Sequence, residues 1–331
     1  MSKIRQTIAV VVPCYSVKKH ISKVLLSIGP EVSHIYVIDD CCPENTGDHV
    51  ISTCVDKRVV VLKHEFNQGV GAAVLTGYSA AILDNVDVIV KIDGDGQMSP
   101  KLIPFFVKPI LNGQADYTKG NRFFNLEDVI EMPKIRILGN ALLSFLTKLS
   151  SGYWGIFDPT NGYTAINASV ANLLPFSKIS KRYFFESDML FRLNTIRAVV
   201  LDIPMTAKYA DENSNLKISQ IIFEFLKKHA KNFIKRIFYN YYLRDMSLAS
   251  IELPVGIVML LFGTLFGFYN WVISIHMNTA TPTGTIMLSV LPILFGLQLI
   301  LAFFAQDMAH TPRNPIHLFL NESYNLNGNK K

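Results

Sequence analysis

Residues 86–100 read VDVIVKIDGDGQMSP and combine a buried strand with a cluster of polar side chains. The first half of this stretch is largely apolar, which is typical of a strand inside a sheet. The strand is followed by Asp93 and Asp95, which repel each other unless a cation or a hydrogen-bond donor lies nearby. Ser99 and Pro100 then supply an N-cap and a first helical residue. The stretch therefore predicts a buried strand, a polar site and a helix in direct succession.

The spacing of the polar residues has two explanations. Asp93, Asp95 and Gln97 occupy alternate positions, and alternate side chains project to one side of an extended chain. Three converging oxygen donors suit a hard divalent cation, Mg²⁺ or Mn²⁺, that completes its shell with water and phosphate. A helix-capping turn accounts for Ser99, Pro100 and one of the acids. Spacing alone leaves both explanations open.

The first two hundred residues alternate between strand-like and helix-like patterns. Strands are expected at residues 8–12, 35–38, 59–62 and 86–92, and helices at residues 18–28 and 69–84. This order predicts a mostly parallel sheet, in which ligands bind at the carboxyl ends of the strands. Pro13 and Tyr15 follow the first strand, and Asp39 and Asp40 follow the second. We expect them to share one crevice with Asp93.

Two long apolar segments lie near the C-terminus. Residues 253–275 and 283–305 contain no charged side chain, and about 20 apolar residues suffice for a helix to cross a bilayer. The alternative is a pair of very apolar core helices, which rarely run so long without a charge. The sequence therefore predicts two membrane spans.

The net charge of +6 is concentrated in one segment, residues 217–244, which holds seven basic residues and one acid. Its pattern predicts an amphipathic helix with Lys227, Lys228, Lys231 and Lys235 opposite the apolar face, and with Arg236 on neither face. Such a helix suits anionic membrane lipids, although a solvated surface remains an alternative. Nucleic acid is a poor partner for a segment that adjoins a membrane span.

The distribution of Lys and Arg predicts the orientation of the spans. The loop between them, HMNTATPTG at residues 276–284, has no Lys or Arg, whereas both flanks are basic. The positive-inside rule then places both termini and the N-terminal domain on the cytoplasmic side of the inner membrane.

Several motifs together resemble a known family. VVPCY, IDD, NQGVGAAVLTGY, DGDGQMSP, KGNRF, PTNGYTAI and FFESDMLFRL follow one another in the family's order. On these motifs the chain resembles glycosyltransferase family 2 enzymes of GT-A fold. Within that family it is similar to the polyprenyl-phosphate glycosyltransferases, the group of dolichol-phosphate mannose synthase and its bacterial membrane-anchored relatives. The resemblance implies a GT-A, Rossmann-like α/β domain followed by interfacial helices and two transmembrane helices.

The resemblance also implies roles for individual residues. The donor nucleotide would be bound by Pro13, Tyr15, Asp39, Asp40 and Asp93, and a divalent metal, Mg²⁺ or Mn²⁺, by Asp93, Asp95 and Gln97. The catalytic group would comprise Asp95, two phosphate-binding arginines (Arg122 and Arg136), Asp158 near the acceptor, and Glu186 and Asp188 of the acidic motif. The alternative for each arginine is a surface salt bridge, and the alternative for Asp158 is a turn before Pro159.

The nucleotide end of the pattern departs from the family. Pro13-Cys14-Tyr15-Ser16-Val17 lacks the usual Asn and Glu, and DDCCPENTGD replaces the common Asp-Asp-Gly-Ser. These departures leave the nucleotide open; UDP with a hexose is preferred and GDP-mannose is the alternative.

These observations imply an inverting, metal-dependent hexosyltransferase that moves one sugar from a nucleotide-sugar donor to undecaprenyl or dolichyl phosphate. The expected domains are residues 1–212 (catalytic), 213–250 (juxtamembrane), 251–306 (transmembrane) and 307–331 (cytoplasmic tail). Two alternatives remain, a polysaccharide or glycolipid transferase with a hydroxyl acceptor and a non-catalytic scaffold or sugar-nucleotide binder. Homo-oligomer formation also stays open.

Overall fold

The structure is a computed structural model that describes residues 6–124, 134–206 and 218–320, except for the side chains of residues 134–136 and 218–222. The chain forms two compact units. The first comprises Met1–Phe233 and Pro312–Lys331, and the second is Ile234–Thr311.

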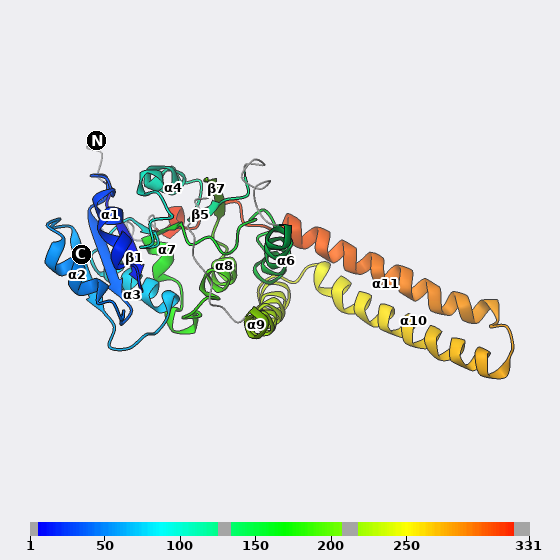
Figure 1. Cartoon of the computed structure of the whole chain (residues 1–331). Coiled ribbons are helices and arrows are strands. Elements are labelled where there is room, and N and C mark those ends of the chain that lie inside the picture. Colours follow the sequence, from blue (N-terminus) through cyan, green and yellow to red (C-terminus); the bar gives the residue numbers. More distant parts are fainter. Residues whose placement is uncertain (1–5, 125–133, 207–217, 321–331) are drawn as a thin grey trace. The chain divides into compact units, whose positions relative to one another are not determined.

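A seven-stranded sheet organises the first unit (Figure 1). The strands are β1 (Ile8–Cys14), β2 (His34–Asp39), β3 (Val59–Lys63), β4 (Val88–Lys91), β5 (Tyr117–Asn121), β6 (Thr164–Asn167) and β7 (Val200–Pro204). Their order is β3-β2-β1-β4-β6-β5-β7. Only β6 runs antiparallel, against both β4 and β5. The predicted mostly parallel α/β sheet is confirmed, and all four expected strands are present.

Helices and short turns connect the strands and cover both faces of the sheet. The helices of this unit are α1 (Lys18–Leu26), α2 (Thr46–Thr53), α3 (Val70–Leu83), α4 (Ile103–Leu111), α6 (Lys134–Ser151), α7 (Ala168–Asn172), α8 (Phe185–Thr195) and most of α9 (Ile218–Phe238). Short 3₁₀ turns lie at Pro100–Leu102 and Phe176–Lys178. The first of these begins after Ser99, where the sequence predicts a helix start.

The core lies on both faces of β1. Because successive strand side chains point to opposite faces, Ala9 and Val11 join a cluster with α3, α7 and α8, whereas Val10 and Val12 join one with α1 and α4. All seven residues of β1 are buried. This double burial explains why the strand has a continuous apolar sequence rather than an alternating one.

A C-terminal strap, which we define as residues 312–320, returns to the first unit after the last apolar helix. Its anchor is Asp116, whose side chain is fully buried. The carboxylate accepts hydrogen bonds from the backbone amides of Ile316 and His317, both at 3.0 Å, and from the His317 ring Nδ1 at 2.7 Å. It also accepts the Val199 amide at 2.7 Å. Asp116 directly precedes β5. One buried carboxylate therefore joins the strap to the start of this strand.

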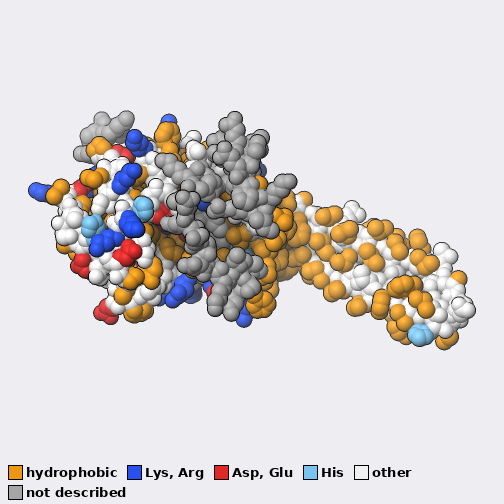
Figure 2. All heavy atoms as spheres, in the orientation of Figure 1, with side chains coloured by type: hydrophobic (Ala, Val, Ile, Leu, Met, Phe, Trp, Pro, Cys, Tyr) orange, Lys and Arg blue, Asp and Glu red, His pale blue; other side chains and the backbone are white. Residues whose placement is uncertain are grey.

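The second unit contains a helical hairpin of α10 (Ala249–Met277) and α11 (Thr283–Ala309). Both helices are long and apolar enough to cross a membrane, with mean hydropathies of 2.0 and 2.4 over their most apolar windows, which are only 11% and 17% buried. Apolar side chains cover the visible face of the hairpin (Figure 2). Such exposure is unlike a soluble core helix and indicates a membrane protein.

Small residues bring the two helices of the hairpin together. A Cβ added at Gly256 would lie 2.9 Å from the Gly296 carbonyl oxygen, and one added at Gly263 would lie 2.6 Å from that of Ser289. The Ser289 hydroxyl also donates to the Gly263 carbonyl at 2.8 Å. Close backbone approach and inter-helix hydrogen bonds are typical of helix packing in lipid.

Arg236, which fitted neither face of the predicted amphipathic helix, is buried in the second unit. Its guanidinium donates to both carboxylate oxygens of Asp307 in α11, at 2.6 and 3.0 Å, and Tyr241 donates to the same carboxylate at 2.7 Å. Tyr241 lies in a π-helical turn, Tyr239–Arg244. The irregular position of Arg236 in the sequence therefore reflects a buried ion pair.

We predict that Asp116→Ala destabilises the protein by about 3 kcal/mol, because it leaves three backbone amides, two of them buried, without an acceptor. Thermal unfolding of the full chain in detergent measures this effect. The control is Asp48→Ala, which removes an exposed carboxylate paired with Lys63 and should cost under about 1 kcal/mol. Equal losses of stability in the two variants would contradict the anchoring role of Asp116.

Candidate active site

A cavity of about 780 Å³ opens at the carboxyl ends of β1 and β4. It is lined by Pro13, Cys14, Tyr15, Val17, Asp40, Asn67, Gly69, Val70, Ala73, Lys91, Asp93, Gly94, Asp95, Thr160, Gly162, Arg182, Tyr183, Glu186 and Phe225. Six of the predicted site residues are among them: Pro13, Tyr15, Asp40, Asp93, Asp95 and Glu186. The structure therefore brings the ends of β1, β2 and β4, the start of α3 and the start of α8 to one cavity.

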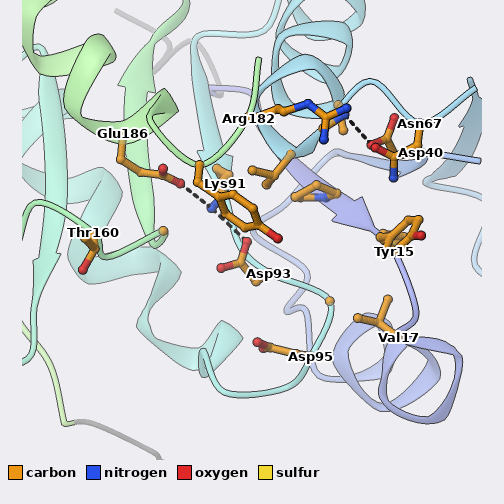
Figure 3. Close-up of a pocket in the computed structure, with 18 of the residues that line it drawn as sticks. Tyr15, Val17, Asp40, Asn67, Lys91, Asp93, Asp95, Thr160, Arg182 and Glu186 are labelled. Atoms are coloured by element: carbon orange, nitrogen blue, oxygen red, sulfur yellow. Dashed lines mark hydrogen bonds and ion pairs between the residues drawn. The ribbon is translucent and has the colours of Figure 1, made fainter. Parts of the chain in front are cut away.

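Lys91 joins two of these acids at the base of the cavity (Figure 3). Its ammonium nitrogen lies 2.8 Å from Asp93 Oδ1 and 3.4 Å from Glu186 Oε1, and its side chain is 2% exposed. Burial alone would lower the pKa of Lys91, but the two carboxylates outweigh burial and raise it. Lys91 is thus a permanent cation between a loop acid and a helix acid.

Asp40 shapes the opposite wall of the cavity. Its carboxylate accepts the backbone amides of Gln68 and Gly69, at 2.9 and 2.7 Å, and contacts His64 Nδ1 at 2.7 Å. Gly69 has a φ of 98°, a conformation that favours glycine. This network fixes the turn into α3. Gly69 therefore forms the turn that begins α3.

Asp39, predicted to line the nucleotide pocket, is not among the cavity-lining residues. It is buried, and its carboxylate accepts the amides of Cys42 at 2.7 Å and Gly47 at 2.6 Å. In the structure Asp39 therefore holds the turn between β2 and α2. Its contact with a nucleotide stays a prediction.

The acidic loop presents Asp95 to the cavity. Asp95 Oδ1 accepts the backbone amide of Gln97 at 2.9 Å, and the side chain of Gln97 does not line the cavity. Within the described residues no group of three or more His, Cys, Asp or Glu is arranged to hold a metal ion. Carboxylate and amide oxygens are nonetheless the donors that Mg²⁺ uses when substrate phosphates complete its shell. The donor set fits a cation shared with a phosphate.

Arg122 and Asp158 form a two-point ion pair beside the cavity. Arg122 Nε donates to Asp158 Oδ2 at 2.8 Å and Nη2 donates to Oδ1 at 3.0 Å. The Asp158 side chain is fully buried, whereas that of Arg122 is 26% exposed. Arg122 Nη2 also lies 3.3 Å from the hydroxyl of Thr160, a cavity-lining residue. Asp158 therefore fixes the plane of a guanidinium at the rim of the cavity.

Of the two remaining predicted residues, only Asp188 has a described side chain, and it lies away from the cavity. Asp188 is buried and accepts the Ser180 amide at 2.8 Å and the Asn232 side chain at 2.9 Å. It links α8 to α9 and does not line the cavity. Arg136 belongs to α6, and its side chain lies outside the described residues.

The sequence analysis missed two cations of the cavity, Lys91 and Arg182. Arg182 points toward Asp40 and Asn67 (Figure 3). Lys91 had a detectable signal, because a lysine directly before an acidic motif in an otherwise apolar strand requires a partner when buried. Arg182 lies in the stretch KISKRYFFESD. No feature of this sequence distinguishes a cavity-lining arginine from an ordinary surface arginine.

Comparison with known proteins assigns the family. Residues 9–174 match the domain described as Glycosyl transferase family 2. The chain belongs to this family. The predicted relationship is confirmed, and the match covers the strands and loops that build most of the cavity.

Its relatives within glycosyl transferase family 2 include polyprenyl-phosphate sugar transferases. The UDP-N-acetylglucosamine–dolichyl-phosphate N-acetylglucosaminyltransferase of Methanococcus voltae is 28% identical over a 218-residue alignment that covers 62% of this chain and 86% of that protein. The undecaprenyl-phosphate mannosyltransferase of Micrococcus luteus is 28% identical, covering 53% of this chain and 71% of the relative. The dolichol-phosphate mannosyltransferase of Pyrococcus furiosus is 23% identical, covering 66% and 62%.

Solved structures confirm the GT-A fold. Glucosyl-3-phosphoglycerate synthase from Mycobacterium tuberculosis, in complex with Mn²⁺, UDP and glucosyl-3-phosphoglycerate, superposes with a TM-score of 0.53 at 18% identity. The superposition covers 70% of this chain and 80% of that one. The same enzyme is also solved with Mg²⁺ and UDP. At this identity the likeness concerns the fold alone.

Proposed function

We propose that this chain transfers one sugar, with inversion, from a nucleotide-sugar donor to a polyprenyl phosphate at the cytoplasmic face of the membrane. The observation that carries the proposal is the cavity itself, which is lined by the acids Asp93, Asp95 and Glu186 and by the cations Lys91 and Arg182. Such a mixture suits a ligand that is anionic and brings a metal ion. The named relatives, which act on dolichyl and undecaprenyl phosphates, support the acceptor class.

The donor side of the proposed site is the wall formed by Tyr15, Asp40, Asn67 and Arg182. Tyr15 is 51% exposed and offers a ring face on which a nucleobase can stack. Arg182 points across the same wall and can bind phosphate oxygens in two-point fashion. UDP with a hexose remains the preferred donor, and GDP-mannose the alternative.

The metal would be held by Asp95, with Asp93 nearby; Gln97, the third predicted ligand, does not line the cavity in this structure. A divalent cation there would neutralise the negative charge that develops on the departing nucleoside diphosphate. The role of the chain is to fix these oxygens, and the Gln97 amide that binds Asp95 Oδ1 restricts the carboxylate to one orientation. Mg²⁺ and Mn²⁺ both suit this donor set.

The acceptor side would be the rim where Arg122 lies. A lipid monophosphate is substantially ionised at neutral pH, since its second pKa is about 6, and it needs no strong general base. Asp158 is buried against Arg122, so we assign it the positioning of that guanidinium rather than proton abstraction. Glu186, paired with Lys91, is likewise poorly placed as a base, which disfavours a hydroxyl acceptor.

The membrane association we propose follows from exposed side chains of α9 and from the hairpin. Phe223, Ile234 and Phe238 are 74%, 66% and 55% exposed, and exposed lysines at positions 227, 231 and 235 lie between them along the helix. Apolar and basic side chains on one exposed helix suit the headgroup region of an anionic bilayer. We retain the division into catalytic, juxtamembrane, transmembrane and tail segments as part of this proposal.

Two experiments, chelation of the metal and substitution of Asp95, test whether transfer depends on a divalent cation. Purified protein in detergent is screened with UDP- and GDP-sugars, undecaprenyl and dolichyl phosphate, and Mg²⁺ or Mn²⁺. We expect EDTA to abolish transfer and Asp95→Asn to lower the rate on the order of 10³-fold while thermal unfolding is unchanged, because an ionised ligand is lost. If the wild type still turns over in EDTA, the proposed metal dependence is wrong. If no donor gives a product, the proposed transferase activity is wrong.

Cysteine labelling tests the membrane topology. Cys41 is an exposed native thiol of the first unit, and Asn314→Cys and Ala280→Cys place thiols in the strap and in the loop between the spans. The two engineered cysteines are made with Cys41 replaced by serine. Because the strap is bonded to Asp116, Cys41 and Asn314→Cys should lie on one side and Ala280→Cys on the other.

An impermeant thiol reagent on intact cells reads the outcome. The positive-inside rule predicts labelling of Ala280→Cys alone, with the other two sites labelled after lysis. Labelling of Cys41 and Asn314→Cys alone would keep the hairpin and reverse its orientation. If only one of Cys41 and Asn314→Cys is labelled on intact cells, the two sites lie on opposite sides of the membrane, which would contradict the hairpin.

A further inference from the structure

Lys91 occupies the position from which it can influence the proposed metal site directly. It is the last residue of β4, and its ammonium group contacts Asp93, the first acid of the loop that also carries Asp95. The second contact, Glu186, comes from α8. Lys91 therefore neutralises one of the two loop carboxylates before any ligand binds.

Gly162 leaves room for the Lys91–Asp93 ion pair because it has no side chain. A Cβ added at Gly162 would lie 2.3 Å from Lys91 Nζ and 2.6 Å from Asp93 Oδ2, closer than atoms can approach. Gly162 belongs to the loop before β6, whose residue Thr164 pairs with Lys91 in the sheet. Three elements thus converge on the pair: β4, the loop before β6, and α8.

The ion pair has a consequence for a divalent cation that arrives alone. Such a cation would approach Asp93 and Asp95 against the fixed charge of the Lys91 ammonium. In the part of the chain that the structure describes, it would also find no third acidic or histidine ligand in a metal-binding arrangement. A nucleotide diphosphate supplies both missing elements, namely further oxygen ligands and negative charge.

We infer that Lys91 makes metal binding depend on the nucleotide, so that the cation enters as a complex with the diphosphate and not by itself. Lys91 acts through Asp93 and is therefore a positioning residue. This inference rests on the proposed function and specifies how its donor site is filled. It is an electrostatic coupling, reciprocal between the metal and the nucleotide.

A purely structural role for Lys91 predicts a different behaviour. A buried ion pair that only stabilises the fold would, when broken, loosen the site and weaken every ligand. The coupling role instead predicts a gain in affinity for the metal and no gain for the nucleotide. Without the ammonium, Mn²⁺ alone should bind more tightly, while UDP measured without metal should bind no more tightly than before, because a nearby cation has been lost.

The experiment measures binding of MnCl₂ and of UDP, with GDP in parallel, to the full-length protein in non-ionic detergent. Free Mn²⁺ is counted by electron paramagnetic resonance, and nucleotide binding by calorimetry. In the wild type we expect Mn²⁺ to bind about 100-fold more tightly with nucleotide than without. Equal Mn²⁺ affinity with and without bound nucleotide would overturn the inference without any variant.

Lys91→Met and Lys91→Gln remove the charge, and Lys91→Gln keeps a hydrogen-bond donor for the carboxylates. Either folded variant should bind Mn²⁺ alone at least about tenfold more tightly than the wild type, with no gain in UDP affinity in EDTA. Lys63→Met is the matched control, since it removes the same charge from an exposed pair with Asp48 and should leave both affinities unchanged.

The outcomes separate this inference from the proposed function. A folded variant with unchanged or weaker Mn²⁺ affinity would overturn the coupling role of Lys91 while leaving the transferase intact. Failure of the wild type to bind either nucleotide under any metal condition would refute the proposed donor site itself.

Discussion

Several carboxylates lie close together at the ends of the parallel strands, in a partly buried cleft. Each one needs a hydrogen-bond donor or a cation, and the partner that it finds determines its role in the site. Asp39 is satisfied by two backbone amides and Asp40 by two amides and a histidine. Asp93 is satisfied by Lys91. Since an unpaired buried charge is very costly, these partners decide which acids are committed to the fold. Asp40 and Asp93 line the cavity together with Asp95, whereas Asp39 does not.

The same rule organises the chain beyond the cavity. Asp116 joins the C-terminal strap to the sheet of the first unit, and Asp307 joins Arg236 and Tyr241 within the second unit. In both cases a buried carboxylate connects segments that are far apart in sequence. Breaking such a contact from one side costs more than the contact contributes, because the partner stays buried. Each acid therefore joins distant segments within its own unit, Asp116 in the first and Asp307 in the second.

Periodicity and turn chemistry were sufficient to predict the parallel strands, the polar crevice at their ends and the two apolar helices, because these depend on local sequence. Tertiary pairings were not predictable in this way. Asp39 was expected in the nucleotide pocket, yet its carboxylate is bonded to the turn that follows β2. The antiparallel insertion of β6 depends on long-range pairing. Arg182 reaches the cavity only because the segment before α8 folds over Gly69, whose added Cβ would meet it at 2.8 Å.

The central claim is that the acceptor is a phosphate, so the decisive measurement compares two lipids that differ only in that group. Purified protein, the best nucleotide-sugar donor and Mg²⁺ are incubated with undecaprenyl phosphate or with undecaprenol, and glycosylated lipid is separated by anion exchange. The account predicts an anionic glycosyl phosphate from the first lipid and no product from the second, because Glu186 and Asp158 are committed to Lys91 and Arg122 and are not placed to deprotonate a hydroxyl. Comparable transfer to undecaprenol would contradict it.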